Sequence, residues 1–103
     1  MTAYDVDVDD VVYRHVDGAD LLARIYRPRG AGPFPGVVGV HGGVWTAGSR
    51  VSNEVLDSAL ARSGVVVVAL DVRKPPAAGY PASVLDVREG TRWLLRHAAD
   101  LDV

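Results

Sequence analysis

Residues 36–45 read Gly36-Val37-Val38-Gly39-Val40-His41-Gly42-Gly43-Val44-Trp45. Everything before the histidine is glycine or valine, a composition that suits a short strand buried on both faces. Two glycines follow the histidine, and glycine allows backbone angles that a side chain forbids. Such a turn can point backbone N–H groups into a cavity, where they stabilise negative charge that develops on an oxygen atom. The stretch therefore predicts a strand that leads into an anion-stabilising loop.

The composition is that of one globular domain and argues against several kinds of ligand. The chain has 103 residues, of which 49% are hydrophobic and 23% are charged, as in an ordinary single domain. Its net charge of −2 provides no basic surface, so we expect no nucleic-acid binding. No cysteine is present, which excludes disulfides and thiolate metal sites. The three histidines lack the spacing of metal ligands, and we expect neither a metal nor a cofactor.

The start of the chain resembles no targeting signal. Residues 1–10 are acidic and lack the basic and apolar regions of a signal peptide. No apolar run approaches the ~18 residues that a membrane-spanning helix needs. We therefore expect no membrane span and, by default, a cytoplasmic location.

The first third of the chain predicts a hairpin. β-Branched and aromatic residues mark two strands, at 9–16 and 19–26. The pair Asp17-Gly18 between them is a strong turn signal, so we expect the strands to be antiparallel. Residues 27–35 contain three prolines and two glycines and form a loop. The third strand then covers residues 36–40.

The next segment predicts a helix followed by a buried strand. Apolar residues at helical spacing mark a helix over residues 49–63, with Ser49 or Ser52 as its N-cap and Gly64 beyond its end. Residues 65–70 read Val-Val-Val-Val-Ala-Leu. An apolar run without alternation is typical of a central parallel strand.

Residues 82–100 carry apolar side chains three and four apart, which predicts a long amphipathic helix. The order of elements is then β-β-β-α-β-α. A strand, a crossover helix and a parallel strand form a right-handed βαβ unit, to which the hairpin attaches on one side. The predicted fold class is therefore α/β, an antiparallel hairpin plus parallel strands flanked by helices.

Three segments resemble one enzyme family. The sequence His41-Gly42-Gly43-Val44-Trp45 matches the His-Gly-Gly-x-Trp motif of α/β-hydrolase serine esterases, in their hormone-sensitive-lipase-like and arylformamidase-like groups. Residues 71–82 resemble the Asp-Tyr-Arg-x-x-Pro-x-x-x-Phe-Pro-Ala block that follows in this family, and residues 86–98 resemble the helix before its nucleophile strand. The resemblance covers nearly the whole chain and places it in the N-terminal part of the α/β-hydrolase sheet.

The resemblance implies an ester-hydrolysis site that binds a small-molecule ester. In the family a serine attacks the ester carbonyl, a histidine activates the serine, an acid orients the histidine, and N–H groups of the glycine turn hold the oxyanion. The expected oxyanion donors are the N–H groups of Gly43 and Val44, with Gly42 shaping the turn. The resemblance makes His41 a residue that braces this loop, and Trp45 either lines an acyl pocket or caps the core.

Two charged residues, Asp71 and Arg73, follow the strand at 65–70. The carboxyl end of a strand is a common ligand position in α/β sheets. We favour a different role for both residues, as an ion pair or hydrogen-bonded clamp that braces the loop.

The reacting residues of the family are missing from this chain. Its nucleophile lies in a Gly-x-Ser-x-Gly turn, and no serine here has glycines two residues before and two residues after it; the serines are Ser49, Ser52, Ser58, Ser63 and Ser83. The family's acid and histidine come later still. We therefore predict a truncated α/β-hydrolase domain over residues 1–103, the oxyanion-loop portion of a carboxylic-ester hydrolase, inactive alone.

Two other functions stay open. The strand at 36–40 is expected to expose an apolar parallel edge, which would make the chain a non-catalytic association module that pairs with a second copy or with a complementary C-terminal half. A weaker alternative is a small independent enzyme with His41 as base. For that case we expect ester cleavage no faster than an imidazole-like background.

Overall fold

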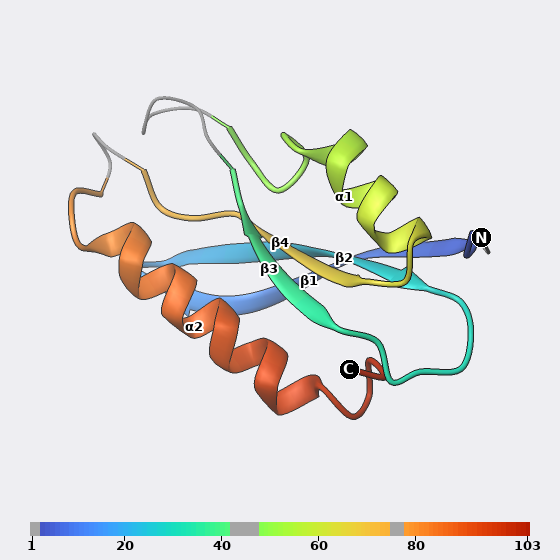
Figure 1. Cartoon of the computed structure of the whole chain (residues 1–103). Coiled ribbons are helices and arrows are strands. Elements are labelled where there is room, and N and C mark those ends of the chain that lie inside the picture. The colour runs from blue at the N-terminus through green and yellow to red at the C-terminus, as the bar shows by residue number, and fades with distance from the viewer. Residues whose placement is uncertain (1–2, 42–47, 75–77) are drawn as a thin grey trace.

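The computed structural model describes residues 3–41, 48–74 and 78–103, and Figure 1 shows the whole chain. The elements follow the predicted order: β1 (Val6–Val16), β2 (Ala19–Pro28), β3 (Gly36–Val40), α1 (Glu54–Arg62), β4 (Val66–Leu70) and α2 (Ala82–His97). The four strands form one mixed sheet in the order β1-β2-β4-β3. The predicted α/β class, with a hairpin and a parallel pair flanked by helices, is confirmed.

The hairpin forms around the turn that the sequence predicts. Asp17 and Gly18 have φ angles of 51° and 73°, and two positive φ angles are what a two-residue hairpin turn of the favoured type requires. Strand β1 pairs antiparallel with β2 from Val6 opposite Pro28 to Val16 opposite Ala19, with one irregularity between Val12 and Arg14. Both strands are longer than predicted, because pairing between them orders the acidic segment before residue 9.

Strand β4 is the centre of the sheet. It pairs antiparallel with β2 and parallel with β3, and all of its residues are buried. Successive side chains of a strand point to opposite faces. On one face Val66, Val68 and Leu70 pack with Leu94 of α2, and on the other Val67 and Ala69 pack with α1. Figure 1 shows the two helices on opposite sides of the sheet.

The two helices differ from their predicted bounds at the ends. Helix α1 begins at Glu54, and its N-cap residue is Asn53, whose side chain makes no capping bond. The predicted caps were wrong: Ser49 N–H donates to Ser52 Oγ in a turn that precedes the helix. The predicted glycine after α1 is confirmed, since Gly64 has a φ of 101°. None of the helices that the structure describes is long and apolar enough to cross a bilayer.

Candidate functional site

The predicted site residues flank the carboxyl ends of two adjacent parallel strands. Val40 at the end of β3 lies opposite Leu70 at the end of β4, so His41 and Asp71 follow these strands at one edge of the sheet. This edge is where open α/β sheets bind ligands. The predicted oxyanion residues Gly42, Gly43 and Val44, together with Trp45, lie outside the described residues. The geometry of the site is therefore that of the segments on either side of them.

Asp71 holds the segment that follows residue 47. Its Oδ1 accepts the backbone N–H of Arg50 at 2.6 Å, and its Oδ2 accepts Nη1 of the same residue at 2.8 Å. The backbone of Asp71 is itself fixed to the sheet, because its N–H donates to Leu22 O at 2.8 Å and its carbonyl accepts Tyr13 Oη at 2.5 Å. Asp71 therefore connects the two hairpin strands to the segment around Arg50.

Arg50 also contacts strand β1. Its Nε and Nη2 lie 3.2 and 3.3 Å from the carboxylate of Asp10, which also accepts two hydrogen bonds from Arg24 of β2, at 2.9 and 3.0 Å. The hydrogen bonds from Arg24 and then from Arg50 hold the pKa of Asp10 well below its ordinary value. The four residues form a chain of alternating charge, Asp71–Arg50–Asp10–Arg24, which joins strands β1 and β2 to the segments that follow β4 and precede α1.

A second tie joins the same two segments. Lys74 Nζ donates to the backbone carbonyl of Gly48 at 2.8 Å. Gly48 is the first described residue after the glycine-bearing stretch, so the segments that follow β3 and β4 are connected both at Gly48 and at Arg50. The sequence carries no sign of either contact, because Arg50 lies outside the recognised motifs and Lys74 stands at an unspecified position of the block at 71–82.

Arg73 does not pair with Asp71. Its backbone N–H donates to Asp86 Oδ2 at 2.8 Å and its Nη1 to Asp17 Oδ2 at 2.9 Å. Asp86 is fully buried and also accepts Arg14 Nη1 at 2.6 Å. The hydrogen bond to Asp86 raises the pKa of the Arg73 guanidinium above its ordinary value. Arg73 thus ties the segment after β4 to α2 and to the hairpin turn, rather than to Asp71.

The buried position of Asp86 had a signal in the sequence. Ala82, Asp86, Gly90 and Leu94 are the buried residues of α2, and they stand four apart. A helix places residues four apart on one face. Asp86 therefore belongs to the face that packs on the sheet, where a carboxylate requires cationic partners.

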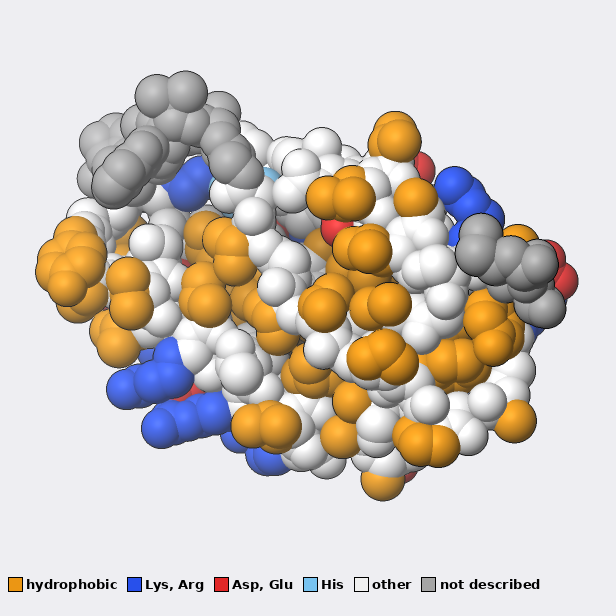
Figure 2. Space-filling model, viewed as in Figure 1, with side chains coloured by type: hydrophobic (Ala, Val, Ile, Leu, Met, Phe, Trp, Pro, Cys, Tyr) orange, Lys and Arg blue, Asp and Glu red, His pale blue; other side chains and the backbone are white. Residues whose placement is uncertain are grey.

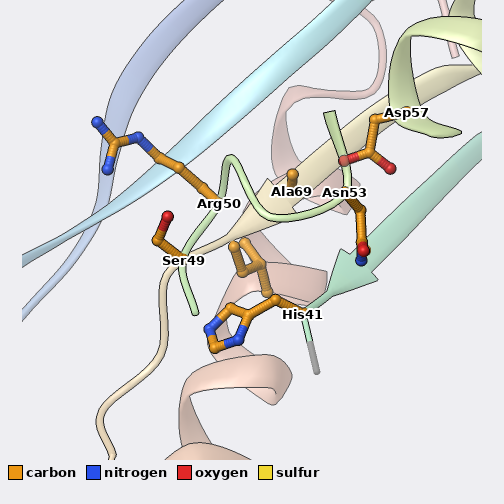
Figure 3. Close-up of a pocket in the computed structure, with 8 residues that line it drawn as sticks. His41, Ser49, Arg50, Asn53, Asp57 and Ala69 are labelled. Carbon is orange, nitrogen blue, oxygen red and sulfur yellow. The ribbon is translucent and has the colours of Figure 1, made fainter. Parts of the chain in front are cut away.

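A small hollow lies beneath the end of β3 (Figure 3). Its lining comes from three segments and includes Gly39, His41, Ser49, Arg50, Asn53, Asp57, Ala69 and Leu70, and it encloses about 0 Å³ of space that a water molecule could occupy. Pockets that take drug-sized ligands enclose roughly 300–1,000 Å³, so this hollow cannot hold an ester substrate by itself. Asp57 of α1 is only 5% exposed, and its burial raises the pKa of its carboxyl above the ordinary 3.8.

Comparison with known proteins identifies the lineage of this arrangement. Residues 24–103 match the family BD-FAE. The carboxylic ester hydrolase LipN of Mycobacterium tuberculosis is 35% identical over 96 residues, which are 92% of this chain and 25% of LipN. The chain therefore spans about a quarter of the length of that relative.

Solved structures agree with the sequence match. An esterase from Pyrobaculum calidifontis superposes with a TM-score of 0.85 at 35% identity, over 94% of this chain and 32% of that one. The esterase Est2 from the Planctomycetes species Thermogutta terrifontis, with propionate bound, superposes with a TM-score of 0.81 at 30% identity, over 98% and 38%. The chain thus belongs to the BD-FAE family of α/β-hydrolase esterases and corresponds to the N-terminal part of its longer relatives.

Proposed function

We propose that this chain supplies the oxyanion-loop portion of a carboxylic-ester hydrolase. The N–H groups of Gly43 and Val44 are the proposed donors to the oxyanion, and Gly42 shapes the turn. Family membership carries the proposal. The ties at Arg50 and Gly48 support it, because they hold the residues just beyond this stretch against the carboxyl end of β4. Donors help a transition state only when they are fixed before charge develops.

The residues proposed to brace the loop do so through different contacts. Asp71 braces the loop through Arg50, with both carboxylate oxygens engaged. Arg73 braces the segment after β4 through Asp86. His41 lines the hollow between β3 and the Arg50 segment, where its ring supports the start of the loop. Trp45 completes the proposed substrate pocket as a lining residue.

The reaction needs residues that 1–103 do not contain. No serine here stands in a Gly-x-Ser-x-Gly turn, so the nucleophile, acid and base come from a further segment, and the 103-residue chain alone is inactive. The substrate is a small-molecule ester, and the propionate bound to Est2 favours a short acyl group.

A chimaera tests the proposal. The LipN segment that aligns with this chain is replaced by the corresponding residues of the chain, and the fusion is assayed with a short-chain p-nitrophenyl ester. We expect turnover that is abolished by a serine-directed phosphonate. Gly43→Pro removes one proposed donor and should lower kcat by about 10²–10³-fold, whereas Gly79→Ala, a position where an added Cβ meets nothing within 4 Å, should leave kcat unchanged.

Two outcomes of this assay contradict the proposal. One is a chimaera that folds, as judged by circular dichroism, and keeps full kcat after Gly43→Pro. The other is ester turnover by the isolated 103-residue chain above an imidazole background, which would favour His41 as an independent base.

A further inference from the structure

Lys74 is the only lysine of the chain, and its ammonium group contacts a backbone carbonyl rather than a carboxylate. Its Nζ lies 2.8 Å from Gly48 O, and none of the ion pairs that join the described residues includes Lys74. On the face of the molecule shown in Figure 2, hydrophobic side chains predominate and Asp and Glu side chains are few. Hydrogen bonds from a charged donor are stronger than those from a neutral one. The positive charge of Lys74 is therefore directed at one backbone carbonyl.

The backbone on which Lys74 stands is held on both sides. The preceding residue, Arg73, donates its backbone N–H to the fully buried Asp86 at 2.8 Å. The carbonyl of Lys74 itself accepts the N–H of Ala78 at 2.9 Å. The position of Lys74 is thus determined by β4 and α2, and its side chain reaches Gly48 from a fixed base.

Gly48 marks the point where the chain returns to described contacts after residues 42–47. Its φ of 95° lies in the left-handed region that favours glycine. Just beyond it, Ser49 N–H donates to Ser52 Oγ at 2.8 Å and Ser52 N–H donates to Ser49 O at 3.0 Å. Among the described residues after position 47, the bond from Lys74 to Gly48 is the contact nearest in the chain to the proposed oxyanion donors.

Arg50 and Lys74 hold this segment in different ways. The guanidinium of Arg50 makes one hydrogen bond to Asp71 and two to Asp10 of β1, so it joins segments that are distant in the chain. Lys74 is half-buried and makes a single bond, to Gly48. Loss of Arg50 should therefore lower the stability of the whole fold, whereas loss of Lys74 should release only the Gly48 carbonyl.

We propose that Lys74 is a positioning residue of the esterase site, whose ammonium group holds the Gly48 carbonyl and thereby fixes the end of the segment that carries the oxyanion donors. This inference rests on the proposed function. Donors that are fixed before the reaction stabilise the developing charge without reorganisation. A small displacement of such groups lowers the rate even when the substitution lies away from the reacting atoms. Because Lys74 acts on the transition state and not on substrate binding, its loss should lower kcat and leave KM unchanged.

The chimaera with LipN tests this role. Lys74→Met keeps an apolar stem but has no donor, and we expect kcat to fall by about 10–100-fold. The affinity for a trifluoromethyl ketone, on which the serine forms a tetrahedral adduct, should fall by the same factor, because transition-state analogues report the same stabilisation. Lys74→Arg retains a charged donor and should restore most of kcat. Arg88→Met is the matched control, since Arg88 is 53% exposed on α2 and its loss should leave kcat unchanged.

Amide hydrogen exchange on the 103-residue chain tests the contact without any turnover. The amides of Ser49 and Arg50 should exchange faster in Lys74→Met than in the natural chain, whereas those of β4 should not change. Exchange that Lys74→Met leaves unchanged at Ser49 and Arg50 overturns the inference, whether or not the chimaera is active.

The chimaera also separates a failure of this inference from a failure of the proposed function. If Gly43→Pro lowers kcat but Lys74→Met does not, Lys74 has no positioning role and the proposed function stands. Equal losses of kcat in Lys74→Met and Lys74→Arg would likewise overturn the inference, because the charged donor would then have no effect. If Gly43→Pro keeps full kcat, the proposed function is wrong and the inference falls with it.

Discussion

Arg50 contacts the carboxylate of Asp71 twice, with its backbone N–H 2.6 Å from Oδ1 and its Nη1 2.8 Å from Oδ2. The backbone hydrogen bond fixes the path of the chain at Arg50, and the side-chain hydrogen bond joins two groups of opposite charge. The two residues stand 21 positions apart, on segments that follow β3 and β4. This pair therefore fixes the segment around Arg50, which follows the proposed oxyanion loop in the chain, to the segment that follows β4.

Arg50→Ala should lower the free energy of unfolding by about 1–3 kcal/mol, because it removes a charge-assisted hydrogen bond to the half-buried Asp71 and two to the exposed Asp10. Urea denaturation followed by circular dichroism measures the change. Arg92→Ala is the control, since Arg92 pairs with Glu89 on the surface and is 55% exposed; such pairs contribute about 0–1 kcal/mol. Equal losses for the two variants would show that the Asp71 contact is energetically unimportant.

Asp86→Asn should destabilise the fold by about 3 kcal/mol or more. The substitution keeps the shape of the side chain but removes the charge that faces Arg14 and Arg73, and breaking a buried ion pair leaves the remaining charge without compensation. Asp20→Asn serves as control, because Asp20 is 58% exposed and pairs with the exposed ring of His15. In thermal denaturation, Asp86→Asn should melt at a much lower temperature than Asp20→Asn. Similar melting temperatures would contradict the proposed role of Asp86 as the buried partner of Arg14 and Arg73.

Asp57 should make stability fall as pH rises. Its ordinary pKa is 3.8 and burial raises it in the folded state, so the unfolded chain loses this proton at a lower pH than the folded chain does. Between those two pKa values the folded state binds more protons, and the contribution of Asp57 to the free energy of unfolding decreases with increasing pH.

Asp57→Asn removes this effect and should stabilise the protein at neutral pH. The difference in unfolding free energy between the variant and the natural chain, measured by urea denaturation from pH 3.5 to 7.5, should grow with pH and then level off. Asp9→Asn, on the exposed face of β1, provides a control in which burial plays no part. A difference that is constant across the range would mean that Asp57 titrates alike in both states.

Gly90→Ala should destabilise the protein although alanine favours helices. A Cβ on Gly90 would lie 2.4 Å from Leu70 Cδ1, and Leu70 is fully buried in the core. Overpacking costs about 1–3 kcal/mol, which exceeds the ~1 kcal/mol that alanine gains over glycine in a helix.

Leu70→Val provides the space that the added methyl group needs. In a double-mutant cycle, Gly90→Ala should therefore cost less in the Leu70→Val background than in the natural one. If the changes in unfolding free energy caused by the two single substitutions simply add up in the double variant, α2 and β4 can separate without cost.

Local signals predicted most of the fold. The apolar run at 65–70 marked β4, Asp17-Gly18 marked the hairpin turn, and Gly64 marked the end of α1, because each depends on backbone preference or on burial of one short segment. The helix start was wrong at Ser49, since Arg50 N–H bonds to Asp71 and this segment therefore follows a tertiary contact rather than its own capping preference. The start of β1 was missed because pairing with β2, not local composition, orders residues 6–8.

The candidate site also combines features that the sequence predicted with contacts that only the tertiary structure shows. The motif at His41 and the block from Asp71 identified the family from sequence, and the comparisons agree with it. The partners of Asp71 and Arg73 could not be read from their spacing. Arg73 and Arg14 converge on Asp86, 13 and 72 positions away in the chain, a meeting that depends on the order of strands and on where α2 crosses them.

The sequence by itself thus determined the element order, the α/β class and the family, because periodicity, turn residues and motifs are written in short segments. Only the tertiary structure decided that Arg50 contacts Asp71 and Lys74 contacts Gly48, and that Asp86 is buried between Arg14 and Arg73. These features depend on distant segments that meet in space. Their energies come from burial and charge pairing, which no single segment specifies.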